Sequence, residues 1–413
     1  TKSPPEPFND RCLIGERGLY PGPQAQVPKF VIDLDQPPSI RWNEVARNFS
    51  KKIKDLSDVL SNKIIEPVLG KKIWRFLDWT LGDLDARFPA PYADELKGNL
   101  VSELRAIMDI FTQSIDSEDD FIEENNSTHQ QRFIRISNAT GVPLGQIVLY
   151  NIFYEIFTVC TSIVAQDESG GIYHARNMDF GLLIGWNRTS HDWLVTEKLR
   201  KMVLNVDFHK NGKLLFRAAT FAGYVGVYNA MRPNSYAVTV NERFKMDGGY
   251  RGIVQWLLKR NNDSWMSWMV RDVFERVPDY ETAVEKLSSI RVIAPLYVII
   301  SGTKSGQGRI IVRSRQKTDG FVDLDDTKRD GWFILETNTD PWSEPTFFDD
   351  RRTPGRNCMQ KLSRKNLTLP GLFQVLSSPT NLNKLTVFSI LIKTDQDRFE
   401  TYVQKCPDPC WPW

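Results

Sequence analysis

The spacing of the hydrophobic positions changes near residue 158. Over residues 42–60, apolar side chains recur every three or four positions, which is the spacing of an amphipathic helix. The same spacing predicts helices over residues 71–86 and 92–115. The apolar run 142–159 is too short and too often interrupted by polar residues for a membrane span, so it predicts a buried helix that ends at Cys160.

Beyond residue 158 the pattern becomes one of short alternating or apolar runs separated by turn residues, which is typical of strands. Strands are predicted over 193–198, 202–209, 213–227, 236–243, 296–301, 309–315, 332–336, 386–393 and 398–404, and an early one over 31–34. Helices are predicted over 250–259, 265–290 and 367–376. Strands, then helices, then strands again indicate an α+β fold with two antiparallel sheets covered by helices.

One predicted hairpin gathers reactive side chains. An alternating run over 158–167 leads into four turn residues, and a second run begins at Ile172. The hairpin would bring a nucleophile, Cys160, towards a permanent cation, Arg176, and a carboxylate, Asp179. Plainer explanations are open at this point. Cys160 fits an inert core thiol, Arg176 a surface partner of Asp167, and Asp179 a turn cap.

The chain has five cysteines and four histidines, and these numbers limit which disulfides and metal sites it can form. The spacing Cys406-Pro-Asp-Pro-Cys410 suits a small disulfide loop, which leaves Cys12 and Cys358 as a natural second pair and Cys160 as the odd cysteine. No histidine lies near a Cys-x-x-Cys pair, so neither a metal nor a cofactor is expected. A formal charge of +2 without a long basic block argues against nucleic acid as a partner.

Seven Asn-x-Ser/Thr triplets are potential glycosylation sites. They lie at Asn48, Asn125, Asn126, Asn138, Asn187, Asn262 and Asn366. The chain opens without a charged-then-apolar signal segment, so we expect either a cytosolic protein or one whose signal has been removed. The triplets and the paired cysteines favour the second, with the protein in a lumenal compartment.

The motifs Cys-Thr-Ser-Ile-Val-Ala (160–165) and Arg-Asn-Met-Asp-Phe-Gly (176–181) resemble those of the acid ceramidases, lysosomal N-terminal-nucleophile amidohydrolases. N-acylethanolamine acid amidases are a sister group, and bile-salt hydrolases and penicillin V acylases are more distant relatives. The resemblance extends from about residue 142 to the C-terminus and, more weakly, over 12–98. It implies a four-layer αββα fold, with a mostly helical N-terminal subunit in addition.

The resemblance also implies that the chain cuts its own Val159–Cys160 bond, giving an α-subunit of residues 1–159 and a β-subunit of residues 160–413. The freed α-amino group of Cys160, with an ordinary pKa of about 8, would serve as the base. Arg176 would hold the thiolate and the substrate carbonyl, and Asp179 would orient the α-ammonium group. His174 is then expected to be structural.

Three further positions match family motifs. Asn338 is the implied oxyanion-hole amide, although residues 339–341 depart from the family's aromatic-Asp pattern. Arg351 would support the site through an ion pair with Asp179 or Asp350, although Asp350 and its neighbour Asp349 fit a helix N-cap equally well. Glu242 is expected to contact the substrate headgroup or Arg176.

The implied reaction is hydrolysis of ceramide (N-acylsphingosine) to sphingosine and a fatty acid in the lysosome lumen, and secretion is a second implied location. Candidate apolar lining residues, which fit the protein core equally well, are Phe180, Leu182, Trp186 and Tyr224. An anionic membrane surface and a saposin-type activator are the expected partners, and the tryptophans of 71–86 would contact that membrane if they are not core residues. An acidic insertion at about 99–141 has no assigned role. The rivals are an N-acylethanolamine acid amidase and a non-catalytic lipid-binding glycoprotein.

Overall fold

The computed structural model describes residues 11–16, 18–20, 27–60, 158–180, 185–244, 261–346 and 349–410, with the single positions 92, 94, 95, 151, 252, 255 and 256. The predicted helices over 71–86 and 92–115 and the acidic insertion lie outside this part of the chain, apart from residues 92, 94 and 95, which are helical. The same holds for Leu182 and for the glycosylation candidates Asn125, Asn126 and Asn138.

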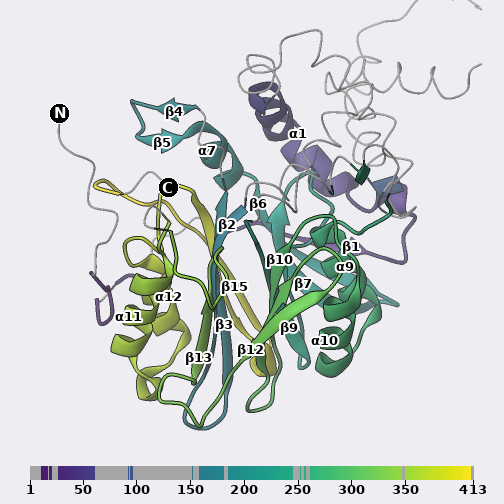
Figure 1. The fold of residues 1–413 in the computed structure, drawn as a ribbon. Coiled ribbons are helices and arrows are strands. Elements are labelled where there is room, and N and C mark those ends of the chain that lie inside the picture. Colours follow the sequence, from purple (N-terminus) through teal and green to yellow (C-terminus); the bar gives the residue numbers. More distant parts are fainter. Residues whose placement is uncertain are drawn as a thin grey trace, which may run out of the picture.

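Two sheets pack face to face and carry helices on both outer faces, so the predicted αββα architecture is confirmed (Figure 1). One outer layer consists of α11 (Arg352–Leu362) and α12 (Leu369–Ser377). The other consists of α9 (Met266–Arg276) and α10 (Tyr280–Ser289). Apolar side chains from both inner faces fill the space between the sheets.

The smaller sheet carries the predicted hairpin at its centre. Its strand order is β13-β2-β3-β14-β15, and all neighbours are antiparallel. The bounds are β13 (Phe333–Glu336), β2 (Thr158–Gln166), β3 (Ile172–Phe180), β14 (Thr386–Lys393) and β15 (Arg398–Val403). At the turn, Asp167 Oδ1 accepts hydrogen bonds from the main-chain N–H groups of Ser169 and Gly171, which fixes the hairpin register.

The larger sheet has the order β1-β6-β7-β8-β9-β10-β11-β12, with only its β1–β6 pair parallel. Its strands are β1 (Lys29–Asp33), β6 (Val203–Lys210), β7 (Lys213–Phe221), β8 (Asn229–Arg232), β9 (Tyr236–Glu242), β10 (Leu296–Ser301), β11 (Gly308–Arg313) and β12 (Thr318–Asp323). Asn211 and Gly212 form the β6–β7 turn with positive φ angles of 52° and 67°, as an Asn-Gly hairpin requires.

The N-terminal region contributes α1 (Asn43–Asp58), whose buried positions repeat at helical spacing as predicted. Both predicted disulfides are present, Cys12–Cys358 and Cys406–Cys410, and Cys160 is the free cysteine. Three candidate glycosylation residues are exposed, namely Asn48, Asn262 and Asn366, whereas Asn187 is half-buried. None of the helices in the described ranges has the length and apolar composition needed to cross a bilayer.

Several predicted elements differ from those observed. The predicted strand 193–198 is mostly the helix α7 (Leu194–Arg200), preceded by a two-stranded ribbon of β4 (Trp186–Asn187) and β5 (Asp192–Trp193). A short apolar run fits either period, and here Val195 and Leu199 are buried at helical spacing. The predicted helix 265–290 is two helices, because Pro278 interrupts it and Asp279 caps the second one, accepting from Thr282 N at 2.9 Å.

The junction before Cys160 also differs from the prediction. Thr158 and Val159 already belong to β2, so Cys160 lies inside a strand and not at the end of a helix. Asn151 is helical, and the rest of 142–157 lies outside the described residues. The elements that were not predicted, β8, β12 and α11, are short or contain many polar residues, which weakens their periodic signal.

Candidate active site

Cys160 is fully buried in the centre of the molecule, where the smaller sheet faces the larger one. It pairs with Met178 across the β2–β3 ladder, and Arg176 pairs with Ser162. Residues 160 and 176 are therefore diagonal neighbours whose side chains leave the same face of the hairpin. The predicted hairpin therefore brings Cys160 and Arg176 together.

Arg176 binds the cysteine sulfur. Its Nη2 atom lies 2.8 Å from Cys160 Sγ and also donates to the main-chain oxygen of Val240, at 2.8 Å. Its Nη1 atom donates to Tyr228 O and Asn229 Oδ1. No ion pair in the described part of the chain involves Arg176, although its side chain is fully buried. The guanidinium is therefore a buried positive charge whose nearest ionisable neighbour is the thiol, so the surface ion pair with Asp167 is excluded.

Two opposing effects set the ionisation of Cys160. Burial raises the pKa of the thiol, and the charge and hydrogen bond of Arg176 lower it. Burial is the larger effect, and the pKa lies above its ordinary value. In this uncut chain the cysteine is therefore a neutral thiol held against a cation.

Asp179 lies on the opposite face of β3 from Arg176, because the two positions differ by an odd number of residues. Its Oδ2 atom accepts a hydrogen bond from Asn383 Nδ2 at 3.0 Å and lies 3.5 Å from Arg351 Nη1. Burial raises the pKa of Asp179 to about 6, although Arg351 acts in the opposite direction. The Asp179 carboxylate therefore lies on one face of the hairpin, and the Cys160 sulfur lies on the other face.

Arg351 joins these groups at the start of α11. Its Nη1 atom donates to the carbonyl oxygen of Cys160 at 2.6 Å, and its Nη2 atom donates to Asn338 Oδ1 at 2.7 Å. The predicted ion pair with Asp179 is present, at 3.5 Å. The second carboxylate is Asp349, at 2.8 Å, and not Asp350, which instead accepts from Thr353 N, at 2.8 Å, in the first turn of α11.

Asn338 fixes the amide of the cysteine residue. Its Oδ1 atom accepts from Cys160 N at 2.9 Å, and its Nδ2 atom donates to the carbonyl oxygen of Glu242 at 2.6 Å. Glu242 thus contacts Asn338 through its main-chain oxygen. The predicted contact between Glu242 and Arg176 is replaced by one from Arg176 to the main-chain oxygen of Val240. Asn338 therefore holds the main-chain nitrogen of Cys160.

His174 takes no part in the cysteine site. Its ring nitrogens lie 2.9 Å from Ser301 Oγ and 2.9 Å from Thr239 Oγ1. Burial, together with the charge of Arg176, lowers its pKa to about 3, so the ring is neutral. It is a structural residue between the sheets, as predicted. No group of three or more potential metal ligands occurs within the described residues.

The predicted apolar lining residues separate into two sets. Phe180 and Tyr224 are buried in the same core cluster as Cys160, and Tyr224 OH donates to Tyr228 OH at 2.5 Å. Trp186 lies on the β4–β5 ribbon, 36% exposed, against Trp193. Their predicted role in substrate binding stays a prediction.

Sequence reasoning missed several residues of the site. Asn229 and Asn383 bind Arg176 and Asp179 from segments far along the chain, and Asp349 binds Arg351. The polar motif Asn381-Leu382-Asn383, in a segment that is otherwise buried, was the available signal for Asn383. Asn229 and Asp349 carry no comparable local signal.

Comparison with known proteins agrees with this geometry. Residues 160–371 match the linear amide C–N hydrolases of the choloylglycine hydrolase family, and residues 25–88 match the beta subunit of N-acylethanolamine-hydrolyzing acid amidase. The chain is 37% identical to the acid ceramidase of Macaca fascicularis over 411 residues, covering 98% of this chain and 94% of that protein. The figures for the Homo sapiens acid ceramidase are the same, 37%, 98% and 94%.

A solved structure of the Caenorhabditis elegans N-acylethanolamine-hydrolyzing acid amidase ortholog aligns with a TM-score of 0.50 and 31% identity, covering 59% of this chain and 100% of that one. Fold and matches together define an amidohydrolase of the linear amide C–N hydrolase class. Within that class, the chain belongs to the acid ceramidase family.

Proposed function

We propose that this protein hydrolyses the amide bond of ceramide, releasing sphingosine and a fatty acid, with Cys160 as the nucleophile. The observation that supports this best is the contact between Arg176 Nη2 and Cys160 Sγ, 2.8 Å long and shielded from solvent. A guanidinium in this position stabilises a thiolate as it forms. The 37% identity with acid ceramidases over 98% of the chain supports the choice of ceramide among amides.

Activation requires cleavage of the Val159–Cys160 bond in this proposal. Attack of Sγ on the Val159 carbonyl carbon would form a thioester while the Cys160 nitrogen takes up a proton and becomes a free amine. Water would then hydrolyse the thioester and leave residues 1–159 as the α-subunit and 160–413 as the β-subunit. Asn338 and Arg351 support this role, because they hold the nitrogen and the carbonyl oxygen of Cys160 in place.

The mature enzyme would then use the same atoms on substrate. The α-amine accepts the thiol proton, Sγ attacks the ceramide carbonyl, and Asn338 with a main-chain N–H stabilises the oxyanion. The amine returns the proton to the sphingosine nitrogen as the carbon–nitrogen bond breaks. Water then releases the fatty acid from the thioester, and Asp179 orients the α-ammonium group throughout.

The uncut state described above is a suitable precursor. Cys160 is fully buried, and its thiol pKa is raised. Substrate can reach the sulfur only after the structure around Cys160 changes, and cleavage of the strand at position 160 would permit that change. We therefore assign the described state to the inactive precursor.

The finer assignments rest on the same family. We place the enzyme in the lysosome lumen, with carbohydrate on Asn48, Asn262, Asn366 and Asn187, and with Asn126 and Asn138 as further sites. The disulfides and the exposure of the first three residues support passage through the secretory route. An anionic membrane and a saposin-type activator are proposed to present the substrate.

A second candidate function is hydrolysis of N-acylethanolamines. It is favoured by the match of residues 25–88 to the beta subunit of that amidase, in the region that we label α, and by the 31% identical solved ortholog. The two substrates share the acyl amide and differ in the size of the amine that leaves. The cysteine chemistry is the same for both.

Parallel assays of the two substrates test the proposal. Purified protein, incubated at acidic pH, should hydrolyse ceramide faster than N-acylethanolamine, and Cys160→Ala should hydrolyse neither. Met178→Leu is the matched control, because Met178 Sδ lies 3.7 Å from the same sulfur and the replacement conserves volume. Ceramide turnover by Cys160→Ala would refute the assignment, and a protein that binds ceramide without turnover would be a lipid-binding glycoprotein.

A further inference from the structure

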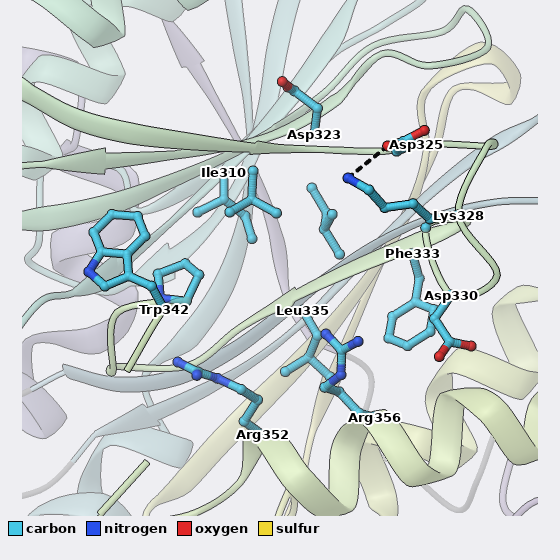
Figure 2. A pocket seen from close by; sticks show the side chains of 14 residues that line it. Ile310, Asp323, Asp325, Lys328, Asp330, Phe333, Leu335, Trp342, Arg352 and Arg356 are labelled. Atoms are coloured by element: carbon cyan, nitrogen blue, oxygen red, sulfur yellow. Dashed lines mark ion pairs between the residues drawn. The ribbon is translucent and has the colours of Figure 1, made fainter. Parts of the chain in front are cut away.

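A cavity of about 420 Å³ opens at one edge of the sandwich, between β11 and β12 on one side and β13 and α11 on the other (Figure 2). This volume is in the range of small-molecule sites. None of the candidate catalytic residues lines the cavity. It is therefore separate from the cysteine site, although β13 pairs with β2 and connects the two regions.

Apolar side chains form most of the cavity walls. Ile310 and Val322 come from the larger sheet, and Phe333 and Leu335 come from β13. Trp342 closes one end and is 58% exposed (Figure 2). An exposed tryptophan that borders an apolar hollow is typical of a surface that binds a hydrophobic ligand.

The acidic side chains around the cavity are largely neutralised by other residues. Lys328 Nζ lies 2.8 Å from Asp325 Oδ2, as the dashed line in Figure 2 marks. Asp323 Oδ1 lies 2.5 Å from Arg309 Nε. Asp330, the third carboxylate, accepts a hydrogen bond from a glutamine of α11.

Two arginines one helical turn apart on α11 carry the opposite charge. Arg356 is exposed, lies 5.4 Å over the ring of Phe333, and forms no ion pair among the described residues. Arg352 donates to main-chain carbonyls of the loop after β13, and its nearest carboxyl group is Glu336, at 3.9 Å. Burial raises the pKa of Glu336 to about 8, so at neutral and acidic pH this carboxyl leaves the charge of Arg352 uncompensated. Arg356 is therefore the guanidinium of the cavity wall that has no carboxylate partner among the described residues.

We propose that this cavity binds the anion of a fatty acid, with its carboxylate on Arg356 and its acyl chain along Ile310, Leu335 and Trp342. A planar guanidinium matches a carboxylate with two parallel hydrogen bonds. The apolar walls match an unbranched hydrocarbon chain, whereas the cationic amine of sphingosine would meet like charge. The inference rests on the proposed function only for the source of the ligand, because hydrolysis of an N-acyl amide releases a fatty acid.

Calorimetric titration of the full-length Cys160→Ala chain with dodecanoate tests the proposal without turnover or acyl transfer. We expect saturable binding of one equivalent, about tenfold weaker in Arg356→Gln, since a hydrogen bond to a charged group is lost. Dodecanol should bind the Cys160→Ala chain about tenfold more weakly than dodecanoate does. Its affinity should be the same for the chain that also carries Arg356→Gln. Arg276→Gln is the control, because this exposed arginine of α9 pairs only with Asp272 among the described residues, on a different helix layer; its affinity should not change.

Photolabelling locates the bound ligand. A diazirine-bearing fatty acid should label peptides that contain residues 331–342 in the Cys160→Ala protein, and Trp342→Ala should reduce that labelling. Labels confined to residues 160–180 and 221–228 would overturn the proposal, because they would place the fatty acid in the cysteine site alone. Equal affinity of dodecanoate for the parent and Arg356→Gln proteins, or absence of saturable binding, would also overturn it. Calorimetry and photolabelling both use the Cys160→Ala chain, so their results do not depend on whether the unsubstituted chain hydrolyses ceramide.

Discussion

The Nη2 atom of Arg176 lies 2.8 Å from the sulfur of Cys160, with both side chains fully buried. The contact joins the two strands of one hairpin, and it places a positive charge against the sulfur that we propose as the nucleophile. In the uncut chain, burial outweighs this charge and keeps the cysteine protonated. In the proposed mechanism, cleavage before Cys160 would have to shift this balance towards the thiolate.

Replacement of Arg176 by lysine tests this relationship. Lysine retains the positive charge, but its single nitrogen cannot reach Cys160 Sγ, Val240 O and Asn229 Oδ1 together. We expect kcat for ceramide to fall about 100-fold in Arg176→Lys with KM nearly unchanged, because the lost contact acts on the thiolate. Steady-state kinetics give the result, and an unchanged kcat would show that the guanidinium is structural.

Glu336 predicts a dependence of stability on pH. Burial raises its pKa from 4.5 to about 8, so the folded chain retains a proton that the unfolded chain has lost. The free energy of unfolding should therefore fall as pH rises from about 4.5 to about 8, by up to about 5 kcal/mol from this group. Glu336→Gln in the Cys160→Ala background should flatten the curve in that window. Urea unfolding at several pH values measures the free energy of unfolding. If it falls equally with pH in Cys160→Ala and in the Cys160→Ala/Glu336→Gln double variant, Glu336 is not the cause.

The ion pair between Glu95 and Arg271 predicts where the N-terminal region is anchored. Both side chains are fully buried, and two nitrogens of Arg271 donate to the two carboxylate oxygens. Glu95→Gln should lower the free energy of unfolding by about 3–5 kcal/mol, because Arg41 and Arg271 both lose the buried carboxylate that they share, and only Glu275 remains beside Arg271. The control Asp272→Asn removes the exposed pair with Arg276 and should cost less than about 1 kcal/mol. Equal losses in denaturant unfolding would show that the buried pair is not the anchor.

The Cys12–Cys358 disulfide predicts how the two proposed subunits stay together. Its cysteines lie 346 positions apart, on opposite sides of the Val159–Cys160 bond. After cleavage, the protein should migrate as one species on a non-reducing gel and as two on a reducing gel. Two species without reductant would show that the bridge is absent from the mature protein.

The hairpin and the contact between Arg176 and Cys160 could be predicted from the sequence because both depend on local order. Alternation over 158–167, the turn at Asp167 and the spacing of Arg176 fix the register, and the register places the guanidinium diagonally across from the sulfur. The faces of a strand follow from the same alternation, so the position of Asp179 opposite Arg176 was also implicit in the sequence.

Other features depend on tertiary structure and could not be predicted. Asp349 rather than Asp350 binds Arg351, because the carboxylate of Asp350 accepts from Thr353 N in the first turn of α11. Asn383 reaches Asp179 across 204 positions, a relationship that no local pattern encodes. Residues 194–200 form a helix because Val195 and Leu199 pack inward, although the run is short enough to fit a strand.

A time course of chain cleavage tests the central claim most directly. Purified full-length protein is shifted to acidic pH, and each sample is divided between intact-mass analysis with N-terminal sequencing and a ceramide assay. We predict a single new N-terminus at Cys160 and ceramide turnover that rises in proportion to the cleaved fraction, with neither in Cys160→Ala. Ceramide hydrolysis at full rate by chains that still carry the Val159–Cys160 bond would contradict the account.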